Sequence, residues 1–563
     1  MTQPDPTAAV PDSQLLATVL VERLLAHGVT DLVLAPGSRS APVAYAAWQV
    51  RDRLRVHVRI DERSAGFLAL GLARGSGRPV PVVVTSGTAA GNLLPAMMEA
   101  HHSRIPLVAV TADRPATMIN TGANQTTDQV GLYGCHVRAE ARLASADTHP
   151  RAWAHGITRA LTLGEGRRGG VPGPVHLEVA FADPLVPGPD RPDIDLPATG
   201  FAGDHSAPVP VPVACGPGTV VVAGDLPPDE GRLLADAAAR ARVPLLAEPT
   251  SNARHSPAAI AGHRLLLDTP LADMVDRVIM VGRPTLSRPV QRLLGRRDVE
   301  LVVVDPSPEW IDPATNARLV VPAIELGATD GAALTRWRAV DEAVRARLTD
   351  EPTDREFGVA PVSLAEAVIT AAADATVVLG SSNPIRDVDL VRFPDRPGRY
   401  HANRGLAGID GTVSTAWGIA CGSGAGSTWL FCGDLTFLHD SNGLLVGAEE
   451  PRPEGLRIVV ANDDGGSIFA TLEHGRPERT ASFERLFGTP HGTDLGALCN
   501  AHGITHRRFI DHDQLRAALT EPVTGVEVDE AVVDRSDRHV QTARWQALAQ
   551  DAAMATIRRL PPL

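Results

Sequence analysis

Two aspartates lie where apolar segments of the chain end. Asp434 follows the apolar run 429–432 and Gly433, and Asp463 follows a second such run and precedes Gly465. Apolar segments that end in glycine and polar residues are typical of buried parallel strands, whose carboxyl ends share one edge of a sheet. Two carboxylates and a backbone carbonyl suit a hard cation such as Mg²⁺. We therefore predict that Asp434, Asp463 and the carbonyl of Gly465 bind Mg²⁺, or Mn²⁺, and that the cation binds a diphosphate.

Each aspartate also has an ordinary structural interpretation. An aspartate at the start of a helix, as Asp434 would be, commonly caps that helix, and a sequence such as "NDDGG" is common in turns. The pair is more specific than either residue, because the same context occurs twice, 29 residues apart. The alternative second ligand is Asn462, if the turn is shifted by one residue, although the spacing to the glycine favours Asp463.

The pair resembles the thiamine-diphosphate signature, in which Gly-Asp is followed, after a similar spacer, by an Asn-rich turn. This resemblance implies a glutamate from another module, usually of a partner subunit, that hydrogen-bonds to the aminopyrimidine ring. Glu62 fits this role, because it comes directly after the short segment "RVHVRI" and Asp61, begins an Ala/Gly-rich helix and is followed by "TSGTAAGN" at the next strand end. The structural alternative for Glu62 is stabilisation of the first helical turn through the helix dipole.

Four longer motifs narrow the resemblance. The segments "LAPGSRSAPVAYAA", "TADRPATMINTGANQTTDQVGLYG", "ANRGLAGIDGTVSTAWG" and "FCGDLTFLHDSNGLL" closely resemble the 2-succinyl-5-enolpyruvyl-6-hydroxy-3-cyclohexene-1-carboxylate (SEPHCHC) synthase family of menaquinone biosynthesis. Membership implies a thiamine-diphosphate-dependent transferase. It decarboxylates 2-oxoglutarate and adds the resulting succinyl carbanion equivalent to isochorismate in a Stetter-like 1,4-addition, with release of CO₂. Leu435 departs from the broad Gly-Asp-Gly signature, as is usual within this family.

The resemblance also assigns roles to residues. Both substrates are dianions, and arginine binds carboxylates through paired hydrogen bonds. The predicted substrate-binding residues are Ser38, Arg39, Arg114, Asn124, Gln125, Arg288, Ser382, Arg386, Arg404, Ile468 and Phe469, of which Arg288 aligns only loosely. The predicted cofactor-binding residues are Glu62, Gly87, Thr88, Ile409, Gly433, Asp434, Leu435, Thr436, Phe437 and Asp463. The predicted catalytic residues are Glu62, Arg386 and Arg404.

These residues follow Val/Leu/Ile-rich segments that alternate with helical segments along the whole chain. This pattern predicts an α/β fold of three doubly wound, mainly parallel-sheet modules, one architecture used three times. We predict a pyrimidine-binding module at 1–190, a central module at 218–345 and a diphosphate-binding module at 362–563. A Pro/Gly-rich linker at 191–217 and a charged linker at 346–361 would separate them.

The composition excludes several other classes. The net charge of −13 argues against a nucleic-acid groove. All 53 basic residues are arginine, which excludes Schiff-base chemistry with pyridoxal phosphate and a Walker-A loop. We find no apolar stretch long enough for a membrane span and no secretory signal. The five cysteines form no C-x-x-C pair, so we expect a cytoplasmic protein.

Two rival interpretations remain at this point. One is another thiamine-diphosphate-dependent 2-oxoacid decarboxylase or carboligase of the acetolactate synthase type, against which the many arginines in the motif loops argue. The other is a non-enzymatic nucleotide-binding α/β protein, in which Asp434 caps a helix or binds ribose. If Glu62 must meet a cofactor bound by another chain, the protein is a homodimer at minimum, or a homotetramer.

Overall fold

The computed structural model describes residues 10–561 apart from 148, 189, 195, 198–207, 350–357, 425 and 536–537. The chain divides into two compact units, the first formed by 1–206, 405–425 and 439–453 and the second by the rest. Parts of both predicted linkers, 198–207 and 350–357, lie outside the described residues. Within the described residues, no helix combines the length and the apolar character needed to cross a membrane.

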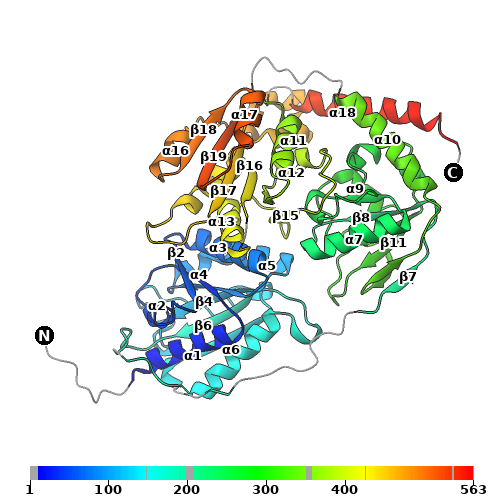
Figure 1. The fold of residues 1–563 in the computed structure, drawn as a ribbon. Coiled ribbons are helices and arrows are strands. Elements are labelled where there is room, and N and C mark those ends of the chain that lie inside the picture. The colour runs from blue at the N-terminus through cyan, green and yellow to red at the C-terminus, as the bar shows by residue number, and fades with distance from the viewer. Residues whose placement is uncertain are drawn as a thin grey trace. The chain divides into compact units, whose positions relative to one another are not determined.

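The first unit is built on a six-stranded parallel sheet with the order β2-β1-β3-β4-β6-β5. Its valine-rich strands are buried on both faces, as β3 illustrates. Helices α1 (Asp12–Ala26), α2 (Ala41–Trp48) and α6 (Pro150–Gly164) pack a hydrophobic core against one face. Helices α3 (Glu62–Ser76) and α5 (Leu94–Ser103) lie on the other side, as Figure 1 shows, and α4 (Thr88–Asn92) follows β3. The strands are β1 (Asp31–Leu34), β2 (Arg55–Val58), β3 (Val80–Val84), β4 (Leu107–Asp113), β5 (Ala139–Ala144) and β6 (Val175–Ala180).

Helix α3 packs against α13 (Thr412–Gly422), a later segment of the chain that belongs to the first unit. Glycines at the contact allow this close approach. A Cβ atom on Gly71 would lie 2.2 Å from the backbone oxygen of Thr415, and one on Gly418 would lie 2.3 Å from the backbone oxygen of Leu68. Any larger residue at either position would push the two helices apart.

The second unit contains two large sheets and one two-stranded sheet, and the first large sheet is five-stranded and parallel with the order β12-β11-β10-β8-β9. Helix α7 (Pro228–Ala241) covers one face. Helices α8 (His263–Leu266), α9 (Arg288–Leu294) and α10 (Ala332–Thr349) cover the other, together with the C-terminal α18 (Arg538–Ile557). The strands are β8 (Thr219–Ala223), β9 (Leu245–Ala247), β10 (Arg277–Val281), β11 (Glu300–Val304) and β12 (Ala317–Val321). A separate pair, β7 (Val211–Val213) and β13 (Ile324–Leu326), places three residues of the predicted first linker in a strand.

The other large sheet of the second unit has six parallel strands in the order β15-β14-β16-β17-β19-β18. Helices α11 (Pro361–Ala371), α12 (Asn383–Val388) and α17 (His512–Leu519) pack against one face. The connecting segments include α14 (Asp434–His439), α15 (Thr480–Phe483) and α16 (Leu495–Ala501). The strands are β14 (Thr376–Leu379), β15 (Arg399–His401), β16 (Thr428–Gly433), β17 (Gly455–Asn462), β18 (Thr505–Phe509) and β19 (Gly525–Val532). The sequence pattern did not predict β18 or β19. Strand β18 is polar or charged apart from Phe509, and acidic residues interrupt the apolar residues of β19.

The three large sheets share one topology. Numbered along the chain within each sheet, the first four strands are arranged 2-1-3-4, and the two six-stranded sheets match at all six positions. Doubly wound sheets bind ligands at the carboxyl ends of the strands where the order reverses, here between the first and third strands. These switch points lie between β1 and β3, between β8 and β10, and between β14 and β16. The predicted fold class is confirmed, whereas the module boundaries stay a prediction.

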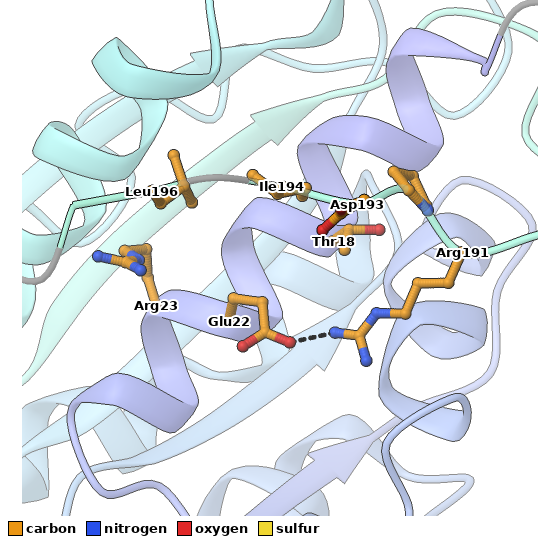
Figure 2. Close-up of a pocket in the computed structure, with 8 residues that line it drawn as sticks. Thr18, Glu22, Arg23, Arg191, Asp193, Ile194 and Leu196 are labelled. Atoms are coloured by element: carbon orange, nitrogen blue, oxygen red, sulfur yellow. Dashed lines mark hydrogen bonds and ion pairs between the residues drawn. The ribbon is translucent and has the colours of Figure 1, made fainter.

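One surface cavity, of about 540 Å³, lies between α1 and the segment that follows the first sheet. Figure 2 shows Glu22 of α1 bonded to Arg191 of this segment, and Arg23 donates to the carbonyl of Pro197 (3.1 Å). None of the residues that line the cavity is a predicted site residue. The cavity therefore reflects how the start of the predicted linker packs on α1.

Candidate functional site

Asp61 caps the helix that Glu62 begins. The Asp61 carboxylate accepts hydrogen bonds from the backbone N–H groups of Arg63 (2.9 Å) and Ser64 (3.3 Å). The Glu62 side chain is half-exposed, and its carboxylate lies 3.5 Å from the amide nitrogen of Asn92, on α4. Because Asp61 accepts the backbone N–H groups of the first turn of α3, the Glu62 carboxylate is not needed as a cap and remains accessible to a ligand.

Arg114 and Gln125 meet at the carboxyl end of β3. Arg114 Nη1 donates to the hydroxyl of Ser86 and to the carbonyl of Gln125 (2.7 Å), and the Gln125 amide donates to the carbonyl of Ser86 (3.1 Å). Gly87 has φ +82°, and a Cβ atom there would lie 3.1 Å from Gln125 Cγ, so the position favours glycine. Ser86 was missed as a site residue, although it stands directly before Gly87 in the "TSGT" motif.

Arg39 brings a second cation to this edge of the sheet. Burial lowers the pKa of the Arg114 guanidinium, and the charge of Arg39 lowers it further. Gly37 lets the loop that carries Arg39 approach the end of β3, since a Cβ atom on Gly37 would lie 2.3 Å from Thr85 Cβ. Two guanidinium groups close to one switch point favour a dianion over a neutral ligand.

Asp434 performs two tasks in the second unit. It is 2% exposed and begins α14 at the carboxyl end of β16. Its Oδ1 accepts the N–H of Leu435 (2.6 Å), and its Oδ2 accepts the N–H of Gly465 (2.8 Å). Strands β16 and β17 are parallel neighbours, as the sequence predicted, so their two terminal turns lie at one edge of the sheet. Asp434 thus bonds to the start of its helix and also reaches the turn after β17.

Asn462 and Asp463 differ in whether their side-chain oxygens already have hydrogen-bond partners. The Asn462 amide donates to a carboxylate of β19 (2.9 Å) and accepts the N–H of Asp464 (3.0 Å). Asp463 Oδ2 accepts from the hydroxyl of Ser467, whereas its Oδ1 is buried with no hydrogen-bond partner in the described part of the chain. Burial and the charge of Asp434 raise the pKa of the Asp463 carboxyl to about 7. A cation between the two carboxylates would relieve this repulsion, so the donor set fits a divalent cation.

His491 was not predicted as a site residue. Its Nδ1 accepts the N–H of Thr493 (2.9 Å), so its proton lies on Nε2, which donates to Asp434 Oδ2 (3.1 Å). No local signal marks this contact, because His491 lies 57 residues after Asp434 in a segment without strand or motif pattern. Among the described residues, no group of three or more His, Cys, Asp or Glu side chains could hold a metal ion. The predicted set has only two carboxylates, with a carbonyl as its third member.

Three predicted substrate-binding residues come together in the second unit. Ser382 has φ +81°, a strained conformation for any residue but glycine, and its carbonyl accepts from Arg386 Nη1 (2.8 Å). Burial lowers the pKa of Arg386, and the charge of Arg404 lowers it further. Arg404 is 4% exposed, and its Nη2 donates to the hydroxyl of Thr285 (2.6 Å). Two further cations thus lie near the switch point between β14 and β16.

The remaining predicted residues have more separate surroundings, and their roles stay predictions. Phe469 packs against Phe487, with ring centroids 5.7 Å apart. Arg288 forms a salt bridge with Glu473 (2.7 Å), and its side chain is 66% exposed, so its guanidinium already has a partner. Ser38, Thr88 and Asn124 are exposed, Ile409, Gly433, Leu435 and Ile468 are half-buried, and Thr436 and Phe437 are buried.

Comparison with known proteins shows the family to which the chain belongs. Residues 15–132 match the family described as "Thiamine pyrophosphate enzyme, N-terminal TPP binding domain". The chain is 48% identical to a 2-succinyl-5-enolpyruvyl-6-hydroxy-3-cyclohexene-1-carboxylate synthase of Kineococcus radiotolerans, over 96% of the chain and 100% of the relative. Proteins of the same name match in Nocardioides sp. (46% identity, 97% of the chain and 100% of the relative) and Rhodococcus erythropolis (43%, 92% and 96%). Identity at this level over nearly the full length confirms the resemblance seen in the motifs: the chain belongs to the SEPHCHC synthase family of thiamine-diphosphate enzymes.

Proposed function

We propose that the chain catalyses the thiamine-diphosphate-dependent decarboxylation of 2-oxoglutarate and the 1,4-addition of the resulting succinyl unit to isochorismate, with release of CO₂, in menaquinone biosynthesis. One observation carries this proposal. In a chain of this family, the buried Asp434 and the half-buried Asp463 lie at the ends of neighbouring parallel strands. The Oδ1 atom of Asp463 is itself buried and has no hydrogen-bond partner among the described residues. A protein that did not bind a cation there would gain stability by replacing one carboxylate with a neutral side chain.

The residues at this edge fit a divalent cation that binds a diphosphate. When bound, thiamine diphosphate supplies the electron sink that decarboxylation of a 2-oxoacid requires. Asp434 and Asp463 would hold Mg²⁺ or Mn²⁺, with the carbonyl of Gly465 as a further ligand. Glu62 would hold and move a proton at the aminopyrimidine ring, for which its accessible carboxylate is suited.

The arginine pairs account for the choice of substrates. Arg39 and Arg114 lie together in the first unit, and Arg386 and Arg404 lie together in the second. Each pair would bind and orient carboxylates of a dianion, and the buried members keep water away from it. A substrate as small and neutral as the acceptor of an acetolactate synthase would have no second carboxylate for these arginines to bind, so the two pairs favour dianionic substrates over that rival.

We further propose that the enzyme is a homo-oligomer, a dimer at minimum, whose active sites each combine Glu62 of one copy with Asp434 and Asp463 of another. The support is the chemistry of the family, in which the glutamate and the diphosphate site come from different modules. The choice between dimer and tetramer, and the cytoplasmic location expected from the cysteine usage, stay predictions.

An omission assay tests the proposed reaction. Purified protein is incubated with 2-oxoglutarate, isochorismate, Mg²⁺ and thiamine diphosphate, and the ultraviolet absorbance of isochorismate is followed while each component is left out in turn. We expect loss of isochorismate only when all four are present, with CO₂ released in equal amount. Pyruvate in place of 2-oxoglutarate serves as the control for substrate choice.

Two results would contradict parts of the proposal. Consumption of 2-oxoglutarate without consumption of isochorismate would leave the decarboxylation intact and refute the acceptor. Turnover that continues without added metal, after treatment with a chelator, would refute the role of Asp434 and Asp463 as metal ligands.

A further inference from the structure

The five-stranded sheet, which we call the middle sheet, has the same 2-1-3-4 order of its first four strands as the two six-stranded sheets. Its switch point, however, is filled by backbone of the protein itself. The turns after β8 and β10 pair through their backbones, with Asp225 N–H bonded to Arg283 O (3.2 Å) and Arg283 N–H to Asp225 O (3.4 Å). A Cβ atom on Gly224 would lie 2.0 Å from the carbonyl carbon of Arg283. Backbone therefore fills the place between β8 and β10 where a sheet of this kind would bind a ligand.

A buried glutamate supports this closed turn. Glu248 follows β9, is 2% exposed, and accepts the backbone N–H groups of Leu286 (2.8 Å) and Thr285 (3.2 Å). Burial raises the pKa of Glu248 to about 7, against the charge of Arg404, which lowers it. A carboxylate with two N–H donors fixes the backbone of both residues, and with it the direction of the Thr285 side chain.

Thr285 passes this constraint on to a predicted substrate-binding residue. Its hydroxyl accepts from Arg404 Nη2 at 2.6 Å, although the two residues are 119 positions apart in the chain. Arg404 is nearly fully buried and lies beside Arg386, so the two guanidinium charges repel each other. A neutral hydroxyl holds one N–H of Arg404 without neutralising its charge, which keeps that charge available to an anion.

We propose that Glu248 and Thr285 are positioning residues, through which the middle sheet holds the Arg404 guanidinium in the orientation that binds a substrate carboxylate. This inference rests on the proposed function, since it requires a dianionic substrate at Arg404. The middle sheet then contributes to the reaction without binding a ligand itself, because the residues near its switch point orient Arg404.

Thr285→Val tests the inference with little change in shape, since it removes the hydroxyl and keeps the backbone N–H that Glu248 binds. In the protein loaded with thiamine diphosphate and Mg²⁺, KM for at least one of the two dianions should rise about tenfold, the value of one hydrogen bond to a charged group, while kcat changes less than about threefold. Thr285→Ser, which restores the hydroxyl, should return KM to the wild-type value. Glu248→Gln should raise the same KM, because the amide cannot accept from both N–H groups as the carboxylate does.

Ser256→Ala is the matched control. The Ser256 hydroxyl donates to Ala235 O (2.9 Å) in the same sheet module and has no contact with Arg404. The control should lower the melting temperature about as much as Thr285→Val and leave both KM values unchanged. If Thr285→Val and Ser256→Ala have the same KM values, or Thr285→Ser fails to restore them, the inference is refuted. If wild-type protein turns over neither substrate, the proposed function falls and this inference with it, whereas an active wild type with unaltered variants refutes the inference alone.

Discussion

Asp61 and Glu62 stand side by side at the start of α3 and have different surroundings. The Asp61 carboxylate accepts hydrogen bonds from two backbone N–H groups of the helix, whereas the Glu62 carboxylate makes a long contact, of 3.5 Å, with Asn92. The same contrast separates Asn462, whose amide is used at both ends, from Asp463, whose Oδ1 is buried without a partner among the described residues. At the scale of the residue, structural and functional roles are thus divided between neighbours.

Glu62→Gln should abolish proton transfer and leave the fold intact. We expect kcat to fall by about 10²- to 10⁴-fold, the usual contribution of a general acid–base group, with Mg²⁺ and thiamine-diphosphate binding retained in calorimetry. Asp61→Ala is the contrasting variant, because it should lower the free energy of unfolding by about 1 kcal/mol and change kcat only a few-fold. Equal kcat for Glu62→Gln and wild type would exclude Glu62 from catalysis.

Asp463→Asn should weaken metal binding. The amide oxygen remains a possible ligand but the negative charge is lost, so we expect Mn²⁺ affinity, measured by electron paramagnetic resonance, to fall at least about tenfold. Asn462→Ala should lower the free energy of unfolding by about 1 kcal/mol through its lost hydrogen bonds and leave Mn²⁺ affinity unchanged. The opposite pattern would identify Asn462 as the ligand.

Glu248 should make stability depend on pH. Burial raises its pKa from 4.5 to about 7 in the folded protein, against the charge of Arg404. Because the folded state holds the proton more tightly, this contribution to stability is full below the unfolded pKa and is lost as pH rises through the folded one. Glu248→Gln cannot ionise, so its free energy of unfolding relative to wild type should rise between about pH 5 and about pH 8, by up to about 3 kcal/mol. Urea denaturation of both proteins at these two pH values measures the difference, and a constant difference would refute the shift.

At the scale of elements, glycines decide how closely segments approach. Gly71 and Gly418 bring α3 against α13, and Gly224 lets the turns after β8 and β10 meet. Glycine is required at these three positions because backbone atoms lie directly across the contact. Backbone conformation is not the reason, since none of the three glycines has a positive φ. Their sequence surroundings look like ordinary helix or strand-end glycines.

Gly71→Ala should force α3 and α13 apart. Its Cβ atom would lie 2.2 Å from the backbone oxygen of Thr415, which cannot rotate away, so we expect the free energy of unfolding to fall by about 1–3 kcal/mol. Gly91→Ala is the control, because nothing lies within 4 Å of the added atom on α4. That control should be neutral or more stable by up to about 1 kcal/mol. Calorimetric melting of the two variants distinguishes a contact effect from a general effect of glycine replacement.

At the scale of the whole molecule, the predicted site residues divide between the two units. Glu62, Gly87, Thr88 and Ile409 belong to the first, and the predicted metal ligands with the turn after Asp434 belong to the second. The two six-stranded sheets have the same topology, and each carries a pair of arginines near its switch point. Both of these sheets therefore carry predicted site residues.

Mixing two inactive variants tests whether those contributions come from different copies. Glu62→Gln and Asp434→Asn are each expected to be inactive as pure proteins. If each site combines two chains, subunit exchange after mixing should restore about a quarter of wild-type activity, because half of the dimers are mixed and each has one intact site. No recovery, with exchange verified by mass spectrometry of the intact dimers, would place Glu62 and Asp434 of one active site on the same chain.

The sequence by itself determined the fold class, the family and the types of residue at the strand ends. Apolar runs that stop at glycine and polar residues are local patterns, so the positions of Asp434, Asp463 and Glu62 could be read without coordinates. The parallel pairing of β16 with β17 also followed, since strands consecutive in such a pattern usually neighbour each other. Strands β18 and β19 were missed, because β18 has a single apolar residue and acidic residues interrupt the apolar residues of β19.

Only the tertiary structure decided which distant groups meet. Thr285 contacts Arg404 from 119 residues away in the chain, and His491 contacts Asp434 from 57 residues away. The sequence around Thr285 and around His491 has no motif that predicts these contacts. The partner of a buried polar group depends on the strand order and on how closely glycines let turns approach, and both are properties of the assembled sheets. That is why candidate site residues could be proposed from the sequence, while the residues that contact them could not.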